Sequence, residues 1–457
     1  MSGLCKGQVI TLTVTDLNNL GAGVGRAEDG RVVFVRGAVS GDVVETEIIK
    51  VNKSFLVGRL LRVISPSPSR MDGFCSAPNA CGGCVYRHVT YEAELELKRD
   101  YVKNAFRKAG LFDVEILPVK HAGRTTGYRN KGQYPLANTK DGIRAGFYAA
   151  KSHNLIPADR CMIQSEAFSP IVRAVCSFAE QKSLSVYNEE TGKGLLRHIY
   201  LRIGERTGQV MLCLVINGES LPFSEDFCRE MTETFPAITG ILLNVNRENT
   251  NVVLGKKMLP LWGNPYIEDE LCGLRFRISP DSFYQVNRDG AELLYGIAAD
   301  LAALTGEETL MDLYCGTGTI GLSMASRAKK LVGVEIVSAA VDCARENAER
   351  NGVDNASFVA ADAGNAEVIL SAAGGVRPDV VVIDPPRKGS TRELVKTLSE
   401  LNVPKVVYVS CDPDTLARDA VWFREEGYEI GEVQPVDLFP RTGHVESVVC
   451  LTRTFNN

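Results

Sequence analysis

The sequence predicts an α/β protein that begins with a small β-barrel and ends in a doubly wound parallel sheet, with a mixed α/β segment between them. From about residue 279 onwards, short β-branched runs alternate with segments of helical periodicity, an order typical of parallel sheets with right-handed crossovers. Residues 7–65 contain only short β-rich runs, whereas residues 115–275 contain both patterns. We therefore expect three domains, at residues 1–66, 67–278 and 279–457.

The first domain is expected to be an OB-like barrel. Strands are predicted at residues 9–14, 31–35 and 42–49, where β-branched residues dominate. The glycine-rich stretch 21–26 predicts a turn between the first two of these strands. The Ser-Pro-Ser-Pro-Ser tract at 65–69 predicts the linker to the second domain.

The second domain begins with a cysteine-rich segment and continues with alternating patterns. Apolar residues recur at helical spacing among charges over residues 90–109, and a second helical pattern covers residues 166–182. Residues 195–203 and 210–216 are β-rich runs. These patterns predict a mixed α/β domain.

The third domain is predicted to contain a strand–helix alternation that gives a doubly wound sheet. Helical periodicity separates the apolar runs that we interpret as its strands. The predicted strands are residues 309–313, 330–335, 356–360, 380–383, 405–410 and 445–451.

The charge distribution favours a local contact with a polyanion. The formal net charge is −5, yet residues 98–160 hold 13 Lys and Arg against 5 Asp and Glu. Residues 1–97 are balanced at 10 against 10, and residues 161–457 are acidic at 28 against 41. A basic segment in an acidic chain predicts RNA contact, with a solvated basic surface as the alternative.

The chain shows no apolar run of transmembrane length and no signal-peptide region at its start. We therefore expect a cytoplasmic protein without membrane contact. Thirteen cysteines in such a protein indicate metal binding or chemistry more than a disulfide framework.

A glycine loop, Cys315-Gly316-Thr317-Gly318, follows the first predicted strand of the third domain and opens a helix. Such a loop lets a ligand approach the backbone, and an acidic residue ending the next strand, here Glu335, accepts hydrogen bonds from ribose hydroxyls. This combination serves either NAD or S-adenosylmethionine. Asp384-Pro385-Pro386 after the fourth strand favours S-adenosylmethionine, because methyltransferases acting on nucleic-acid bases use such a sequence to hold a flipped base.

Cys411 ends a buried apolar run and precedes Asp-Pro, a position where open α/β sheets bind ligands. A thiolate there could add to an electrophilic carbon. Carbon 5 of a pyrimidine is a poor nucleophile until a group adds at carbon 6, so a cysteine beside a methyl-donor site suits C5 methylation. Glu446 is then a candidate for the base that removes the C5 proton, with a simple salt bridge as the alternative.

These motifs, together with Phe283-Tyr284-Gln285-Val286-Asn287 and His444-Val445-Glu446, resemble the RNA uracil-5-methyltransferase family. Residues 7–65, with Val33-Phe34-Val35-Arg36-Gly37, resemble the RNA-binding TRAM domain. The resemblance implies a C-terminal Rossmann-like methyltransferase domain that uses S-adenosylmethionine. It implies Cys411 as nucleophile and Glu446 as proton acceptor. It also implies a donor and base pocket formed by Gln285, Tyr314, Glu335, Asp384 and Asp362.

Cys75, Cys81 and Cys84 have C-x5-C-x2-C spacing. Closely spaced cysteines usually bind zinc, but zinc sites more often show two pairs of cysteines. The family resemblance implies instead a [4Fe-4S] cluster completed by Cys161, which would shape the RNA-binding surface.

The same resemblance favours 23S ribosomal RNA as substrate, because the tRNA-specific branch of the family usually lacks both the barrel and these cysteines. Methylation of a tRNA uridine is the alternative, and a redox-responsive RNA-binding protein with an inactive methyltransferase fold is a third hypothesis. We expect the protein to act as a monomer.

Overall fold

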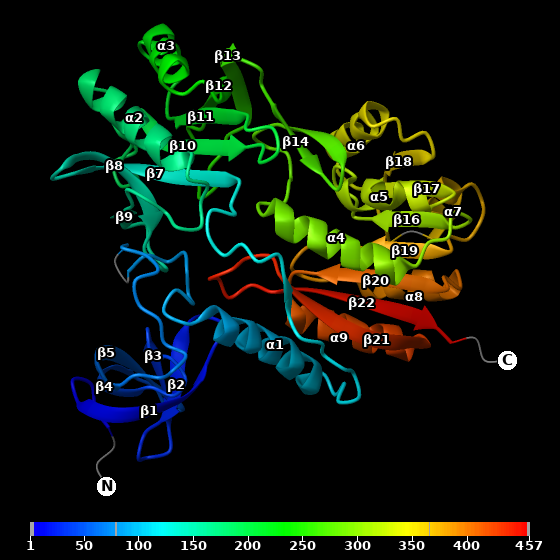
Figure 1. Cartoon of the computed structure of the whole chain (residues 1–457), viewed down its shortest axis with the longest axis horizontal. Coiled ribbons are helices and arrows are strands. Elements are labelled where there is room, and N and C mark those ends of the chain that lie inside the picture. The colour runs from blue at the N-terminus through cyan, green and yellow to red at the C-terminus, as the bar shows by residue number, and fades with distance from the viewer. Residues whose placement is uncertain (1–3, 78–79, 365, 455–457) are drawn as a thin grey trace.

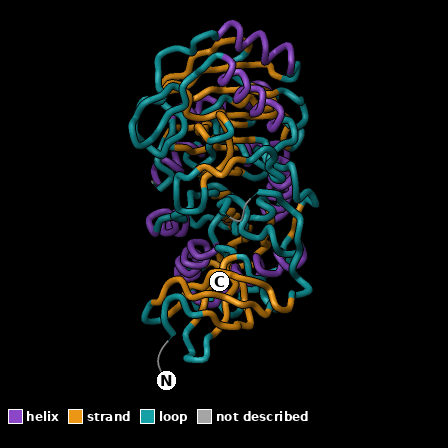
Figure 2. The backbone as a smooth tube through the Cα atoms, turned by 90° about the vertical axis from the view of Figure 1, so that its left-hand side faces the viewer, coloured by secondary structure: helices purple, strands orange, loops and turns teal. Residues whose placement is uncertain are grey.

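The computed structural model describes residues 4–77, 80–364 and 366–454. Figure 1 shows three parts: a barrel at the N-terminal end, a central sheet, and a larger sheet flanked by helices that ends at the C-terminus. Figure 2, a perpendicular view, places the barrel and the central sheet at opposite ends of the molecule. Among the described residues, no helix combines the length and apolarity needed to cross a membrane.

The N-terminal part is a closed barrel with strand order β1-β2-β3-β5-β4. Its core contains Val33, Val35, Val44 and Leu56, all of them fully buried. The turn predicted at residues 21–26 is confirmed only at Gly21, which has a φ of 72° and donates to the Asn18 carbonyl at 3.0 Å. Residues 22–26 form a strand instead, because Gly23 and Gly25 let its backbone pack against Val14, Ala38 and Leu12. The strands are β1 (Val9–Leu17), β2 (Ala22–Arg26), β3 (Val32–Arg36), β4 (Val43–Val51) and β5 (Phe55–Ser65).

Helix α1 (Tyr91–Lys108) follows the cysteine-rich segment and matches the predicted helix. Its apolar side chains, including Val102 and Phe106, join the core of the C-terminal sheet. The short strand β6 (Lys120–His121) pairs with that sheet as well. Helix α1 therefore crosses beneath the C-terminal part (Figure 1), although it precedes the central sheet in sequence.

The central part contains, among the described residues, a seven-stranded mixed sheet in the order β13-β12-β11-β10-β7-β8-β9. The predicted mixed α/β character is confirmed, since helices α2 (Phe168–Gln181) and α3 (Ser224–Thr234) pack on one face. The strands are β7 (Lys131–Thr139), β8 (Gly142–Tyr148), β9 (Leu155–Pro157), β10 (Leu196–Ile203), β11 (Val210–Ile216), β12 (Ile238–Val245) and β13 (Lys257–Gly263). The hairpin β14 (Ile267–Leu271) and β15 (Leu274–Ile278) leads to the C-terminal part.

The C-terminal part is the predicted doubly wound sheet, with order β18-β17-β16-β19-β20-β22-β21-β6. Neighbouring strands from β18 to β20 are parallel, and β22 is antiparallel to both of its neighbours. The strands are β16 (Thr309–Leu313), β17 (Lys330–Glu335), β18 (Ala356–Ala360), β19 (Val380–Ile383), β20 (Lys405–Ser410), β21 (Tyr428–Asp437) and β22 (Glu446–Arg453). The helices are α4 (Arg288–Ala302), α5 (Thr319–Met324), α6 (Ser338–Arg350), α7 (Ala366–Ala373), α8 (Arg392–Glu400) and α9 (Pro413–Glu425).

The strand order reverses between β16 and β19, where β17 and β18 extend to one side and β20 to the other. Buried aliphatic residues cover both faces of this sheet and form two separate cores. In open α/β sheets, ligands bind at the carboxyl ends of the strands beside such a reversal. The topology therefore directs attention to the residues that follow β16, β17, β19 and β20.

Candidate active site

The pairing of β20 with β22 brings the two candidate catalytic residues together. Ser410, the last residue of β20, pairs with Ser447 of β22 in an antiparallel ladder. Cys411 directly follows Ser410 and Glu446 directly precedes Ser447, so both residues adjoin the last pair of this ladder. Asp384, which follows β19, reaches the same edge through the parallel ladder between β19 and β20.

Burial and nearby negative charge control the ionisation of these three groups. Glu446 is only 5% exposed, and burial followed by the charge of Asp384 raises its pKa to about 8. Burial raises the pKa of Asp384 to about 7. Burial, and then the charges of Glu446 and Asp384, raise the pKa of the Cys411 thiol to about 11. Near neutral pH the site therefore holds a protonated thiol beside carboxyl groups that exchange protons readily.

Arg387 supplies the opposing positive charge. Its guanidinium lowers the pKa of both Cys411 and Glu446, although burial outweighs it in each case. One guanidinium nitrogen lies 3.4 Å from Nε2 of His444, whose own pKa is lowered by burial and then by Arg387. Arg387 is exposed, so it borders the opening of the site.

The glycine loop after β16 forms a second half of the site. Gly316 and Gly318 have φ values of 54° and 82°, a left-handed conformation that favours glycine. The Gly316 N–H donates a hydrogen bond of 3.2 Å to Oε2 of Glu335, at the end of β17. A Cβ on Gly316 would meet no other atom within 4 Å, so the loop borders open space.

Asp312 in β16 lies beneath this loop with one oxygen unpartnered. Its Oδ2 accepts a hydrogen bond of 2.8 Å from the Gly321 N–H, while its buried Oδ1 has no partner among the described residues. Burial raises the pKa of Asp312 to about 7, and the charges of Asp384 and Glu335 contribute to the rise. Ile336, beyond Glu335, is 70% exposed. A carboxyl-rich edge beside an exposed apolar residue fits a ligand with a cationic group and a flat apolar ring.

The remaining predicted pocket residues lie around this edge. Tyr314 has a φ of 64°, a strained conformation for a non-glycine residue, and the charge of Asp362 helps to raise its pKa after burial. Asp362 is exposed and accepts a hydrogen bond from the Gly364 N–H at 2.9 Å. Gln285 is half-buried before α4, and no hydrogen bond among the described residues joins its side chain to Cys411 or Asp384.

The four predicted metal-ligating cysteines line one cavity of about 290 Å³. Burial, and then the other three cysteines, raise the pKa of Cys84 to about 12, so the four sulfurs influence one another. Within the described part of the chain, no three His, Cys, Asp or Glu side chains are arranged as ligands of a metal ion. The structure thus gathers the four cysteines without establishing a metal centre. They are Cys75, Cys81, Cys84 and Cys161.

The basic segment 98–160 is not uniformly available to RNA. Lys98 is 1% exposed and is bonded to two carboxylates, so it cannot contact a polyanion. The expectation of an RNA contact is therefore wrong for this residue. Arg129 and Lys131, by contrast, line the cysteine cavity, where burial and then nearby arginines lower the pKa of Lys131 to about 8.

Sequence patterns did not single out Asp312 or Arg387 as site residues. Asp312 lies inside a strand, where an acidic residue among Leu310, Met311 and Leu313 is itself a signal because buried charges are rare without a role. Arg387 follows Asp384-Pro385-Pro386 directly, so its position in the motif was visible but its electrostatic role was not.

A doubly wound sheet with a glycine loop after its first strand, and acidic residues after the next strands, indicates a site for NAD or S-adenosylmethionine, and Asp384-Pro385-Pro386 after β19 favours the S-adenosylmethionine-dependent methyltransferase class. A family model described as tRNA (Uracil-5-)-methyltransferase matches residues 264–454, and a TRAM domain model matches residues 3–61. An uncharacterized RNA methyltransferase of Clostridium tetani is 42% identical over 449 residues, which is 98% of this chain and 97% of that protein. One from Halalkalibacterium halodurans is 41% identical over 98% of this chain and 97% of that protein.

A solved structure supports the same assignment. The Pyrococcus abyssi tRNA (uracil-54, C5)-methyltransferase in complex with S-adenosyl-L-homocysteine matches with a TM-score of 0.79 and 29% identity. The match covers 97% of this chain and 100% of the other. The chain belongs to the RNA uracil-5-methyltransferase family, with an N-terminal TRAM domain, and it is a methyltransferase that uses S-adenosylmethionine.

Proposed function

We propose that the protein methylates carbon 5 of a uridine in RNA through a covalent adduct between Cys411 and carbon 6 of the base. The observation that carries this proposal is that Cys411 and Glu446 adjoin the last pair of the ladder between β20 and β22, and that the charges of Glu446 and Asp384 act on the Cys411 thiol. A nucleophile and a base on adjacent strands can act on adjacent carbons of one pyrimidine ring. The alternative reaction on RNA bases, methylation of an exocyclic amine of adenine or guanine, needs no cysteine.

The proposed reaction uses both groups in order. The Cys411 sulfur donates an electron pair to carbon 6, and the C5–C6 π electrons move to make carbon 5 nucleophilic. Carbon 5 takes the methyl group that bound S-adenosylmethionine would supply, and the donor sulfur would keep the electrons of the broken carbon–sulfur bond. Carbon 5 then carries one hydrogen and one methyl group. Glu446 then removes the C5 proton, the C5–H electrons re-form the double bond, and Cys411 departs as a thiolate.

The ionisation of the site sets the conditions for these steps. Because the pKa of Cys411 is raised to about 11, the thiol must lose its proton as it attacks, and we assign this proton to the neighbouring Asp384 carboxylate, whose pKa is about 7. Arg387 is the cation that favours the thiolate, since it lowers the pKa of Cys411. The raised pKa of Glu446, about 8, makes its carboxylate a stronger base than an exposed glutamate.

We assign the methyl donor to the edge formed by Asp312, the glycine loop and Glu335. When bound, S-adenosylmethionine supplies an electrophilic methyl group on a positively charged sulfur. The carboxyls of Asp312, Asp384 and Glu335 suit that charge, and their mutual effect on pKa supports their closeness. Glu335 would accept from the ribose hydroxyls, while Tyr314, Asp362 and Gln285 would border the donor and the target base.

We further propose that Cys75, Cys81, Cys84 and Cys161 hold a [4Fe-4S] cluster. Four thiols without histidine or carboxylate line one cavity, a set of ligands that suits such a cluster. Zinc is the alternative, because closely spaced cysteines are its usual ligands. The role assigned to the cluster is to hold the segment before α1 in place and to shape the RNA surface.

We propose 23S ribosomal RNA as the substrate of a cytoplasmic, monomeric enzyme, with tRNA as the alternative. The TRAM barrel (residues 1–66) would bind RNA backbone, residues 67–278 would add the basic cavity beside the cysteines, and residues 279–457 would perform catalysis. The presence of all three parts does not decide between the substrates, because the tRNA enzyme of Pyrococcus abyssi matches 97% of this chain.

Mapping of 5-methyluridine in cellular ribosomal and transfer RNA, with and without the gene, tests this proposal. We expect one or more uridines of 23S RNA to lose the modification and to regain it with the wild-type gene but not with Cys411→Ala. Loss confined to tRNA would replace the substrate assignment. An unchanged RNA map, together with no methyl transfer by the pure protein, would favour a redox-responsive RNA-binding protein.

A further inference from the structure

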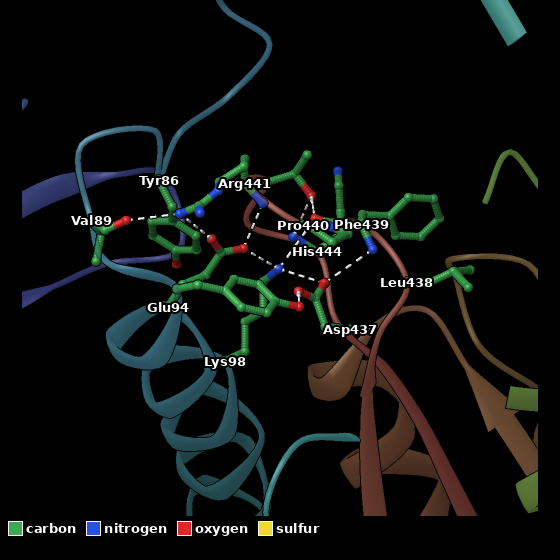
Figure 3. A network of polar contacts seen from close by, with 12 residues as sticks. Tyr86, Val89, Glu94, Lys98, Asp437, Leu438, Phe439, Pro440, Arg441 and His444 are labelled. Carbon is green, nitrogen blue, oxygen red and sulfur yellow. Dashed lines mark hydrogen bonds and ion pairs between the residues drawn. The ribbon is translucent and has the colours of Figure 1, made fainter. Parts of the chain in front are cut away.

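The catalytic hairpin, defined as residues 437–446, joins β21 to β22 and ends at Glu446. A buried network of four charged residues fixes its first half (Figure 3). Lys98 and Glu94 belong to α1, and Asp437 and Arg441 belong to the hairpin; each is at most 5% exposed. Two positive and two negative side chains therefore balance each other in the interior.

Lys98 is the centre of this network. Its ammonium donates hydrogen bonds to Oε1 of Glu94 at 2.7 Å, to Oδ1 of Asp437 at 2.8 Å and to the Phe439 carbonyl at 3.2 Å. Three donors thus meet three acceptors, so the ammonium is fully satisfied. Two of these acceptors lie on the hairpin and the third lies on α1. Lys98 therefore fixes the distance between the hairpin and α1.

Arg441 holds the tip of the hairpin to the segment before α1. Its backbone N–H donates to Oε1 of Glu94 at 2.6 Å, and its guanidinium donates to the Val89 carbonyl at 2.9 Å. The Tyr86 N–H in turn donates to the Arg441 carbonyl at 3.1 Å. Arg441 has a φ of 72°, a strained conformation that persists only where the surroundings enforce it.

Other anchors of the hairpin also come from outside the eight-stranded sheet. The Tyr91 hydroxyl donates to Oδ2 of Asp437 at 2.8 Å, and the Tyr128 hydroxyl donates to the Pro440 carbonyl at 2.9 Å. From the residue that caps α4, Nδ2 of Asn287 donates to the Leu438 carbonyl at 2.9 Å. The hairpin is therefore positioned by residues far away in sequence.

We propose that Lys98, with Glu94, Asp437 and Tyr91, is a positioning network for the base Glu446, required for proton removal and not for methyl transfer. This inference rests on the proposed function. Cys411 follows β20 in the interior of the sheet, whereas Glu446 begins β22 and pairs with Val436, the neighbour of Asp437, so loosening Asp437 displaces the base and spares the nucleophile. Replacing a buried ionic network by apolar residues is often neutral for stability, which makes precise positioning the stronger reason for it.

The two steps can be separated because proton removal is the last one. A displaced Glu446 leaves the methylated base attached to Cys411, so a covalent protein–RNA species carrying the methyl label accumulates. A displacement of about 1 Å can slow a step by about 100-fold. The variants are Tyr91→Phe, which removes one hydrogen bond, Lys98→Met, and the charge-balanced pair Lys98→Met with Asp437→Asn. The measurement is the labelled covalent band on a denaturing gel, compared with turnover and with circular dichroism.

We expect each folded variant to accumulate more covalent RNA than the wild type, least for Tyr91→Phe, with RNA affinity unchanged. Arg197→Met is the matched control, since it removes a buried cation of β10 that donates to the Asn246 and Glu248 carbonyls in the central part of the molecule; it should not accumulate the species. Folded variants that lose turnover without the covalent band, or Tyr91→Phe and the charge-balanced pair both behaving as wild type, would overturn the positioning role. Glu446→Gln must trap the species in the same assay, and its failure to do so would instead refute the proposed function.

Discussion

Glu446 and Cys411 both adjoin the Ser410–Ser447 pair that ends the ladder between β20 and β22. Cys411 follows β20 and Glu446 begins β22, two strands that are adjacent in the sheet but are separated in sequence by α9 and β21. Their charges affect each other, since Glu446 helps to raise the pKa of the Cys411 thiol. The relationship gives one thiol and one carboxyl access to the same small ligand, and the predictions below depend on it.

Cys411→Ala is expected to abolish methyl transfer while leaving the fold and RNA binding intact. The substitution removes the only atom assigned to attack carbon 6, and without that attack carbon 5 is not nucleophilic. Methyl transfer to RNA and RNA binding measure the two effects separately. Cys450→Ala is a suitable control, because Cys450 lies on β22 opposite Val407 and away from the site. Turnover by Cys411→Ala would contradict the nucleophile assignment.

RNA that carries 5-fluorouridine at the target is expected to form a stable methylated adduct with Cys411. Fluorine replaces the hydrogen that Glu446 would remove as a proton, so the double bond cannot re-form and the thiolate cannot leave. Mass spectrometry of the digested complex locates the modified residue. An adduct on any cysteine other than Cys411 would show that the mechanism is assigned to the wrong group.

Turnover is expected to increase with pH up to about 8, because the pKa of Glu446 is raised to about 8 by burial and the base must be ionised to accept a proton. Below that value, the rate of the proton-removal step should rise about tenfold per pH unit. A pH–rate profile between about pH 6 and 9 measures this. The pKa of Lys131 is lowered to about 8, the same value as that of Glu446. If ionisation of Glu446 causes the pH dependence, Lys131→Met should leave the pH–rate profile unchanged.

The buried Glu446 is also expected to make the protein less stable as pH rises. Its folded pKa is raised from 4.5 to about 8, so its contribution to stability is fully present below pH 4.5 and is lost as pH rises through about 8. A difference of one between the folded and unfolded pKa corresponds to about 1.4 kcal/mol of stability. Glu446→Gln should therefore unfold at a higher temperature than the wild type at about pH 8, with little difference at about pH 5. Glu429→Gln, an exposed position on β21, should show no such change.

Much of the architecture was predictable because it depends on local periodicity. The strands at 309–313, 330–335, 356–360, 380–383 and 405–410 were located correctly, since each is a short β-rich run followed by a turn or a polar residue. Strand β21 was missed because its sequence, Tyr-Glu-Ile-Gly-Glu-Val-Gln-Pro-Val-Asp, contains Gly431 and Pro435 and lacks an apolar run. Strand β2 was mistaken for a turn because it also contains glycines, Gly23 and Gly25.

Contacts between distant segments could not be predicted from one sequence. Lys98 was counted in a basic RNA-binding stretch, yet it is buried against Glu94 and Asp437, which is 339 residues away. Local pattern contains no information about such a partner. The assignments of Cys411 and Glu446, in contrast, depended on strand ends, and strand ends are visible in the sequence.

The four clustered cysteines are expected to bind iron and sulfide. Protein purified without oxygen should be brown and contain about four iron and four sulfide per chain, because the four thiols share one cavity and burial within it suits a cluster. Iron, sulfide and zinc analysis with electron paramagnetic resonance measures the content. Cys84→Ser should lose most of the iron, whereas Cys176→Ser, a buried cysteine of α2 outside the cavity, should keep it. One zinc per chain without iron would identify a zinc site. The absence of both metals would mean that the cysteines have a purely structural role. Either result would remove the cluster from the proposed function but would not affect the chemistry assigned to Cys411, which does not line that cavity.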